Sequence, residues 1–148
     1  QKVKHYYGVL EKQFRIYFSK AERSRRNTGE ELMSLLERRL DNVVHRMGFA
    51  QSRAQARQMV AHGHVTLNGH RADRPSMLVK VGDLIRVKNR AKSLQLTQAN
   101  IAENSRSVPD FLSLGEQQIP EGQVVRLPGA EDVSIPVETQ LIIELCSK

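Results

Sequence analysis

The stretch SRAQARQMVAHGHVTLNG, residues 52–69, decides the local fold of this protein. Ser52 and Gln55 are spaced as a capping box, in which the two side chains accept hydrogen bonds from backbone amides of the first helical turn. This spacing predicts a helix over 53–62. Gly63 ends that helix, because glycine readily adopts the left-handed backbone of a helix terminus.

A short strand pair is expected after this helix. Residues 65–67 alternate as in a half-buried strand, and Asn68-Gly69 is the favoured two-residue type I′ hairpin turn. The returning strand over 70–73 stops before Pro75, because proline cannot donate a hydrogen bond to a strand ladder. Residues 84–87 are predicted to form a further strand.

Upstream, residues 28–47 have the strongest helical pattern in the chain. Their apolar side chains fall within one arc of roughly 120° on a helical wheel. A capping box at Thr28 and Glu31 and a terminating Gly48 predict that one continuous helix spans this region. A helix over 7–21 precedes it. The residues of the apolar arc are Leu32, Met33, Leu36, Leu40, Val43, Val44 and Met47.

These elements predict an α+β fold in two parts. A helix–helix–hairpin–strand module spans 38–88, and because about fifty residues make a marginal core, we expect support from neighbouring segments. Residues 1–37 and 89–148 are expected to form a second lobe of helices and short C-terminal strands. The later elements of that lobe are a helix over 92–104 and strands over 124–127 and 141–145.

Charge is distributed unevenly along the chain. Residues 1–100 hold 20 basic and 8 acidic side chains, a net charge of +12, whereas residues 101–148 hold 3 basic and 8 acidic, a net charge of −5. A basic body is typical of a surface that binds a polyanion, and charge spread only for solubility is the alternative.

Composition favours an intracellular, cytoplasmic protein. The hydrophobic share of 39% suits a modest core. No apolar run approaches the ~18 consecutive residues that a membrane-spanning helix needs. The N-terminus lacks the apolar centre of a signal peptide, so we expect neither secretion nor a membrane partner. The single cysteine, Cys146, excludes an internal disulfide.

The sequence offers few candidate residues for a catalytic or metal-binding site. His62, His64 and His70 cluster in the sequence, but only Asp73 offers a nearby carboxylate, so no metal site is predicted. Ser52 is explained by its capping role, and no phosphate-binding glycine motif occurs. We therefore expect a protein that is not an enzyme and uses no cofactor.

Nucleic acid is the ligand that the residues favour. Arg53 and Arg57 stand one helical turn apart beside the apolar side of their helix, and Arg39 and Arg46 border the apolar arc of the preceding helix. Packing of the two helices should bring these arginines onto one basic rim. Such a rim suits folded RNA, which is recognised by shape through phosphates and 2′-hydroxyls. For each arginine by itself, a solvated side chain is the alternative.

Further residues extend this predicted RNA-binding set. The arginine cluster over 23–26 would pair with phosphate or serve only as a solvated linker. Tyr6 would stack on bases, and Tyr7 would either stack in the same way or belong to the core. The complete set is Lys4, Tyr6, Arg15, Arg23, Arg25, Arg26, Arg38, Arg39, Asn42, Arg46, Ser52, Arg53, Arg57, His62, His64 and Lys80.

Several blocks of this sequence, in the same order, resemble the bacterial ribosomal protein S-four family of the small subunit. The region over 38–88 also resembles the small RNA-binding module named after that family, which occurs in pseudouridine synthases and tyrosyl-tRNA synthetases. The matching blocks are residues 7–15, 27–30, 35–44, 46–49, 52–58, 62–65, 67–69 and 141–148.

The resemblance implies a function and a set of partners. It implies a monomer that becomes a structural constituent of the small ribosomal subunit, where it binds rRNA and organises a multi-helix junction of the 5′ domain during assembly. It also implies contact with ribosomal protein S-five and other small-subunit proteins, an influence on translational accuracy, and a position near the mRNA entry path. A cytoplasmic ribosome is expected, with an organellar ribosome as an alternative.

Two features depart from the family pattern. The basic N-terminal segment of the family, which binds zinc in some members, has no counterpart here, so no zinc site is expected. Residues 104–140 are more acidic than the family pattern, and we expect them to face protein or solvent. The alternatives to a ribosomal protein are a modifying or tRNA-charging enzyme that carries the module, and a stand-alone regulatory or stress factor.

Overall fold

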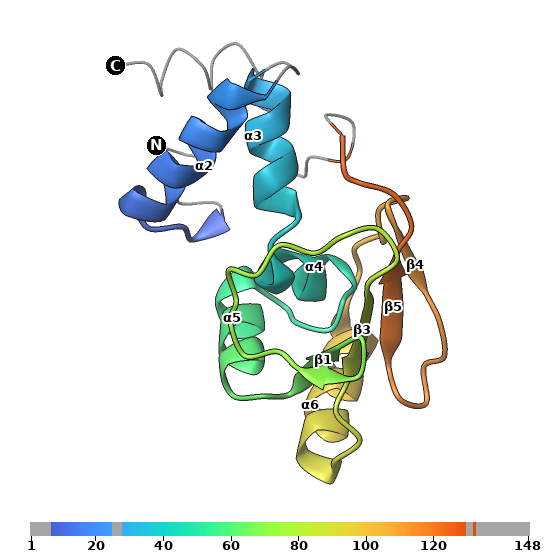
Figure 1. Cartoon of the computed structure of the whole chain (residues 1–148). Coiled ribbons are helices and arrows are strands. Elements are labelled where there is room, and N and C mark those ends of the chain that lie inside the picture. Colours follow the sequence, from blue (N-terminus) through green and yellow to red (C-terminus); the bar gives the residue numbers. More distant parts are fainter. Residues whose placement is uncertain (1–6, 25–27, 130–131, 133–148) are drawn as a thin grey trace. The chain divides into compact units, whose positions relative to one another are not determined.

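Residues 7–24, 28–129 and 132 are described by a computed structural model of the chain, shown in Figure 1. The chain divides into two compact units, Gln1–Glu37 with Pro128–Lys148, and Arg38–Leu127. Helices and an antiparallel sheet together make the mixed α+β fold that the sequence predicted. No helix within the described ranges is long and apolar enough to span a membrane.

Two helices of the first unit, α2 (Glu11–Arg23) and α3 (Thr28–Glu37), pack against each other. Both bury their apolar sides, and Tyr17 and Leu32 are almost fully buried. The predicted helix over 7–21 was wrong at its start. Gly8 has a φ of +67°, outside the helical region, so the regular helix begins only at Glu11.

The continuous helix predicted over 28–47 was also wrong, because the chain breaks between α3 and α4 (Leu40–Arg46). Arg39 has an extended backbone, with φ −65° and ψ 140°. Segment 75–79 supplies backbone partners at the break. The amide of Leu40 donates to the carbonyl of Met77 at 2.7 Å, and the carbonyl of Arg38 accepts from Val79 at 2.8 Å. These partners replace the helical bonds that the break removes.

The stretch over 52–69 forms the elements that were predicted. Ser52 Oγ accepts from the amide of Gln55 at 3.0 Å and caps α5 (Arg53–Ala61). Gly63 follows the helix with a φ of +79°. Strands β1 (Val65–Leu67) and β2 (His70–Arg71) then pair across Asn68 and Gly69, whose φ values of 52° and 82° agree with a type I′ turn.

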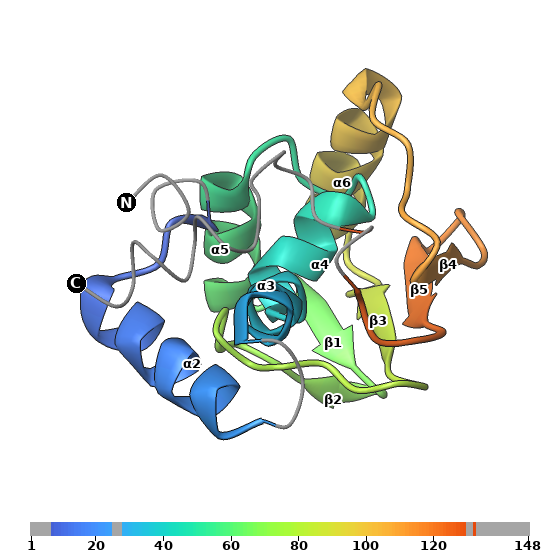
Figure 2. The same cartoon turned by 90° about the horizontal axis from the view of Figure 1, so that it is seen from above.

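The sheet extends past the hairpin through segments distant in sequence. Its strand order is β2-β1-β3-β5-β4, and every neighbouring pair is antiparallel. Figures 1 and 2 show helices α4 and α5 near this sheet, and the core described below joins them to it. The remaining elements are β3 (Leu84–Val87), α6 (Ala91–Glu103), β4 (Leu112–Leu114) and β5 (Glu121–Val124).

The later strands were only partly anticipated. The strand predicted over 124–127 lies earlier in the chain, at β5, and β4 was missed. Gly122 of β5 opposes Ile85 of β3, and a Cβ atom there would lie 2.8 Å from Met47 Sδ. A side chain at position 122 would therefore have to displace the end of Met47, and an internal glycine weakens the sequence signal of a strand. The strand predicted over 141–145 lies outside the described residues.

Pairing of β5 with β3 also gives a division of the chain that differs from the two lobes we expected. Residues 89–127, which we expected beside 1–37, belong to the compact unit Arg38–Leu127. The boundary of the smaller module at residue 88 stays a prediction. The support that we expected for a marginal fifty-residue core therefore comes from the segment that follows it.

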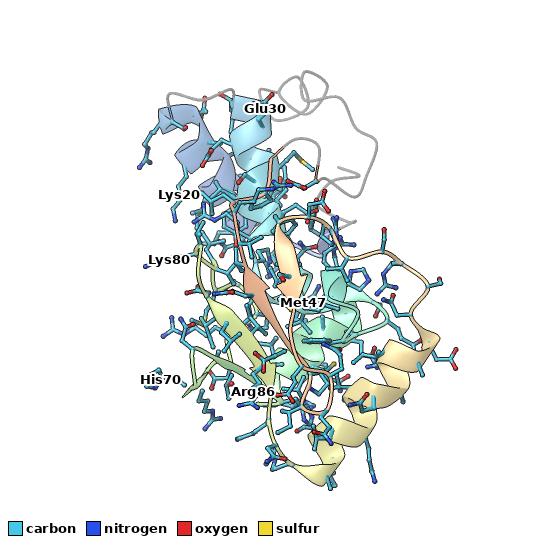
Figure 3. The ribbon with its side chains drawn as sticks, turned by 90° about the vertical axis from the view of Figure 1, so that its right-hand side faces the viewer. Lys20, Glu30, Met47, His70, Lys80 and Arg86 are labelled. Carbon is cyan, nitrogen blue, oxygen red and sulfur yellow. The ribbon has the colours of Figure 1, made fainter. Side chains whose placement is uncertain are left out.

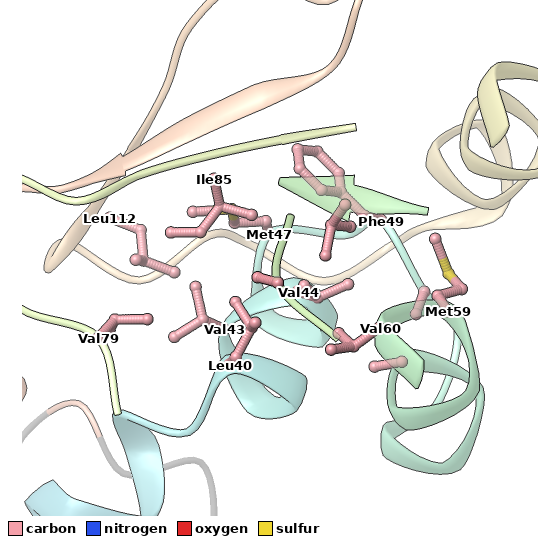
Figure 4. Packing of buried hydrophobic residues seen from close by; sticks show 14 of the residues in the cluster. Leu40, Val43, Val44, Met47, Phe49, Met59, Val60, Val79, Ile85 and Leu112 are labelled. Atoms are coloured by element: carbon pink, nitrogen blue, oxygen red, sulfur yellow. The ribbon is translucent and has the colours of Figure 1, made fainter. Parts of the chain in front are cut away.

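One apolar cluster joins the helices and the sheet of this second unit, and Figure 4 shows part of it. Val43 and Val44 of α4, Val60 of α5 and Ile85 of β3 are fully buried there. Phe111 and Val124, from the segment after the module, are fully buried in the same cluster. This packing fixes α4 and α5 against the sheet, and it therefore fixes the positions of the polar side chains that these helices carry.

Candidate nucleic-acid interface

Asp41, the second residue of α4, lies at the centre of the arginines that border α4 and α5. Its Oδ1 accepts from Arg39 Nε at 3.1 Å, and its Oδ2 accepts from Arg39 Nη2 at 3.0 Å. Oδ2 also lies 3.7 Å from Arg57 Nε. The Asp41 side chain is only 1% exposed. A buried carboxylate that the sequence analysis did not select therefore joins two of the predicted arginines.

The next residue, Asn42, connects this centre to a third arginine. Its backbone amide donates to Asp41 Oδ1 at 2.7 Å, and its side-chain Oδ1 accepts from Arg53 Nε at 2.8 Å. Arg57 is 40% exposed and Arg53 is half-buried. The structure thus brings Arg53 and Arg57 of α5 together against the start of α4, as the predicted rim required.

Arg39 occupies a different position from the one that the helical pattern indicated. Its side chain is 6% exposed and forms a two-bond pair with Asp41. The break between α3 and α4 turns Arg39 inward, whereas a continuous helix would have kept it beside the apolar arc. Arg39 consequently lies behind the surface on which Arg57 is exposed.

At the other end of α4, a buried histidine is surrounded by positive charge. His45 is 8% exposed, and its Nδ1 has no hydrogen-bond partner among the described residues. Burial, with the nearby charges of Arg53, Arg106 and Arg46, lowers the pKa of His45 to about 4. The imidazole is therefore neutral at pH 7, and the positive charge of this region comes from the arginines.

Arg106 is a functional candidate that the sequence analysis missed. Its Nη2 donates to the backbone carbonyls of His45 at 3.2 Å and Ala50 at 3.0 Å. These bonds bring a cation from the acidic segment to the end of α4. The sequence could not predict this position for Arg106, because the residues it contacts are about 60 positions away and local patterns do not report such contacts.

A second group of basic side chains surrounds His64, at the far end of α5. Its Nδ1 lies 2.7 Å from Ser93 Oγ, and its ring centroid lies 6.5 Å from that of His62. Burial and the charges of Arg90, His62 and Lys88 lower the pKa of His64. Lys88 and Arg90 were not selected from the sequence, because the pairing of β1 with β3 brings them to the histidines.

Arg38 and Lys80 lie beside the segment that covers the helix break. Arg38 Nε donates to the carbonyl of Val79 at 3.3 Å, and the backbone amide of Lys80 donates to Asp83 Oδ2 at 2.7 Å. Lys80 is exposed, and Figure 3 shows that its side chain projects outward. The side chain of His70 also projects outward, whereas that of Met47 lies inside. These cations belong to the same unit as the α4–α5 group.

Two predicted site residues of the first unit are described by the structure, Arg15 and Arg23, and both are exposed. Arg15 forms an exposed ion pair with Glu11 at 3.2 Å, and Arg23 is the last residue of α2. Tyr7 is 1% exposed and donates its hydroxyl hydrogen to Glu37 Oε2, so Tyr7 belongs to the core. Four other predicted residues lie outside the described ranges, namely Lys4, Tyr6, Arg25 and Arg26.

The arrangement is suited to holding an anion with several positive centres. Guanidinium groups donate hydrogen bonds to phosphate in a fixed fork geometry. Within the ranges that the structure describes, no group of three or more histidine, cysteine or acidic side chains is placed to hold a metal ion. The arginines that meet Asn42 and Asp41 are therefore the candidate anion-binding group of this unit.

Comparison with known proteins matches two family models to the chain. The S4 domain matches residues 38–85, and the ribosomal protein S4/S9 N-terminal domain matches residues 1–37. The first of these matches covers both helices, α4 and α5, that carry the arginine group, together with the hairpin and the first half of β3.

Curated relatives match along the whole chain. A protein of Thermoanaerobacter sp. strain X514, named small ribosomal subunit protein uS4, is 53% identical over 148 residues, which are 100% of this chain and 71% of the relative. Proteins of the same name from Acetivibrio thermocellus and Thermodesulfovibrio yellowstonii are 50% and 48% identical over 149 aligned residues, with the same coverage.

Proposed function

The chain belongs to the small ribosomal subunit protein uS4 family, and on that premise we propose that it is a structural protein of the small subunit that binds rRNA. The α4–α5 face of the second unit is the proposed centre of this interface. The observation that carries the proposal is the convergence of Arg53 and Arg57 on Asn42 and Asp41.

The charge of this face supports binding to RNA phosphates. Arg57 keeps 40% of its side chain exposed while its Nε lies 3.7 Å from Asp41 Oδ2, so the side chain is partly accessible to a ligand. A protein that places several cations on phosphates releases condensed counterions, and this release supplies much of the binding free energy. Arg46, Arg106, Lys88 and Arg90 extend the positive surface, and His62 and His64 lie beside the last two.

The family relationship supports a finer form of the proposal. We propose that the RNA target is a multi-helix junction in the 5′ domain of small-subunit rRNA, which the protein organises early in assembly. Contact with ribosomal protein S-five, an influence on decoding accuracy, and a position near mRNA in the cytoplasmic ribosome complete this proposal. The candidate residues of the first unit, including Arg15 and Arg23, would make separate contacts with the RNA.

A salt titration of RNA binding tests the proposed interface. We expect Arg53→Ala and Arg57→Ala each to weaken binding to an rRNA fragment that contains the junction, by roughly tenfold for the loss of one charged hydrogen-bond donor. Each change should also reduce the slope of log affinity against log salt by about 1, because one phosphate contact is lost. Filter binding or fluorescence anisotropy at several salt concentrations measures both quantities.

Arg86→Ala is the matched control. Arg86 lies on β3, is 45% exposed and pairs with Glu121, and its side chain alternates with the buried Ile85 and Val87, so it faces away from the core under α4 and α5. Arg86→Ala lowers the net charge by the same amount as Arg53→Ala or Arg57→Ala. It should nevertheless leave the slope of log affinity against log salt close to that of the natural protein. If Arg53→Ala and Arg57→Ala behave like this control, the proposed interface is wrong.

A further inference from the structure

We propose that Asp41 is a positioning residue for RNA binding, a negatively charged side chain that strengthens the affinity of this protein for a polyanion. The inference rests on the proposed function, since it concerns how Arg57 is presented to RNA. A carboxylate would ordinarily weaken binding to phosphate by direct repulsion. The geometry around Asp41 points to the opposite effect.

Both oxygens of Asp41 are occupied by groups of this protein. Oδ1 accepts from Arg39 Nε and from the Asn42 amide, at 3.1 Å and 2.7 Å. Oδ2 accepts from Arg39 Nη2 at 3.0 Å and lies 3.7 Å from Arg57 Nε. The carboxylate therefore contacts one buried arginine and one exposed arginine from different elements.

The buried arginine changes the electrostatic role of this carboxylate. Arg39 and Asp41 are 6% and 1% exposed, and together they form a neutral pair. A buried carboxylate without such a partner would carry a large desolvation penalty. Because Arg39 already compensates the charge of Asp41, the contact with Arg57 restrains that side chain while 40% of it stays exposed.

Restraint of an arginine before binding reduces the cost of ordering it on the RNA. A long, exposed side chain loses rotamer freedom when a ligand fixes it, and this loss opposes association. The Nε of Arg57 lies 3.7 Å from Asp41 Oδ2, and 40% of the Arg57 side chain stays exposed, so a ligand can still reach the restrained side chain. Asn42, whose amide donates to Asp41 and whose side chain accepts from Arg53, places the neighbouring arginine in the same way.

Asp41→Asn tests the inference through the sign of its effect on affinity. If Asp41 acts only as a negative charge, its removal strengthens RNA binding. If it positions Arg57, its removal weakens binding by about two- to tenfold, which is the usual ordering cost of one side chain expressed as affinity. Anisotropy titration of the full chain with the same rRNA fragment measures this change.

Asp73→Asn is the matched control for charge. Asp73 is 48% exposed and lies 3.5 Å from the exposed Arg71, so its replacement removes one negative charge without disturbing the α4–α5 group. We expect this variant to bind RNA as tightly as the natural protein or slightly more tightly. An Asp41→Asn variant that behaves in the same way would overturn the inference.

A double-mutant cycle separates positioning of Arg57 from a general loss of structure. In the Asp41→Asn background, Arg57→Ala should cost much less affinity than it does in the natural chain, because the positioned contact is already lost. Additive effects would overturn the inference while the proposed interface stands. No effect of Arg57→Ala in either background would instead contradict the proposed function.

Thermal unfolding followed by circular dichroism controls for folding of each variant. Asp41→Asn removes the negative charge that accepts from the buried Arg39, so a second variant removes both charges together, Arg39→Met with Asp41→Asn. This variant leaves no unpaired buried charge at the former pair, and loss of one partner alone is the costly change. In this background, too, Arg57→Ala should lose most of its effect on RNA affinity, and a full effect would overturn the inference.

Discussion

His45 illustrates what one buried side chain contributes to this protein. Its imidazole is 8% exposed and lies near the charges of Arg53, Arg106 and Arg46. Burial removes water from the imidazolium, and protonation would also add a positive charge beside three arginines, so the pKa falls to about 4. A neutral residue at this position lets the arginines concentrate around the end of α4.

The lowered pKa of His45 predicts that the protein loses stability on mild acidification. Between pH 6.5 and pH 4 the unfolded chain binds a proton at this histidine and the folded chain does not, so stability falls as the pH falls. The loss attributable to His45 is at most ~3 kcal/mol over this range. Urea unfolding at pH 7, 6 and 5 measures it.

His45→Gln is the control for this pH dependence. Glutamine has no proton to gain in this range, so the variant should lose less stability between pH 7 and pH 5 than the natural protein does. His64, whose pKa is also lowered, remains in both proteins and contributes equally to each. Equal slopes of stability against pH in the two proteins would contradict the assignment.

At the scale of elements, the two glycines that follow α4 and α5 differ in their surroundings. Gly48 and Gly63 have φ values of +85° and +79°. A Cβ atom at Gly48 would lie 2.5 Å from Asn104 Nδ2, whereas one at Gly63 would meet nothing within 4 Å. Asn104 is itself held by Arg106, through bonds of 3.2 Å in both directions.

This difference predicts unequal costs for two similar substitutions. Gly63→Ala should destabilise the fold by about 1–2 kcal/mol, the usual cost of left-handed backbone in an L-residue. Gly48→Ala should cost more, because the new methyl group displaces Asn104 and the loop that carries Arg106. Chemical denaturation of both variants checks this order, and equal losses would show that the contact with Asn104 has no energetic weight.

At the scale of the whole molecule, the second unit depends on residues beyond the hairpin module. β5 pairs with β3, and Phe111 and Val124 are fully buried in the cluster that holds α4 and α5. Without these residues, the β3 edge and part of the core would be open to water. The arginine group on α4 and α5 therefore relies on a segment that contributes few basic residues of its own.

Two fragments test this dependence. A chain of residues 38–127 should unfold cooperatively, whereas residues 38–88 alone should be marginally stable, because about fifty residues bury too little apolar surface to offset chain entropy. Urea unfolding by circular dichroism and amide dispersion in NMR spectra compare them. A 38–88 fragment as stable as the longer one would refute a stabilising role for β4, β5 and Phe111.

Local patterns predicted much of this structure. The cap at Ser52, the end of α5 at Gly63 and the Asn68-Gly69 turn depend on hydrogen bonds and dihedral angles between residues a few positions apart. Such interactions are present in the sequence itself, so they could be predicted from it. The same holds for the neighbouring positions of Arg53 and Arg57 on one helix.

The tertiary structure alone decided the features that depend on distant partners. Segment 75–79 breaks the predicted long helix by bonding to its backbone, and this break turns Arg39 inward onto Asp41. Arg106 reaches the carbonyl of His45 across 61 positions of sequence. Helical periodicity describes one segment at a time, so it determined which residues could line a basic face, whereas long-range packing determined which of them lie on it.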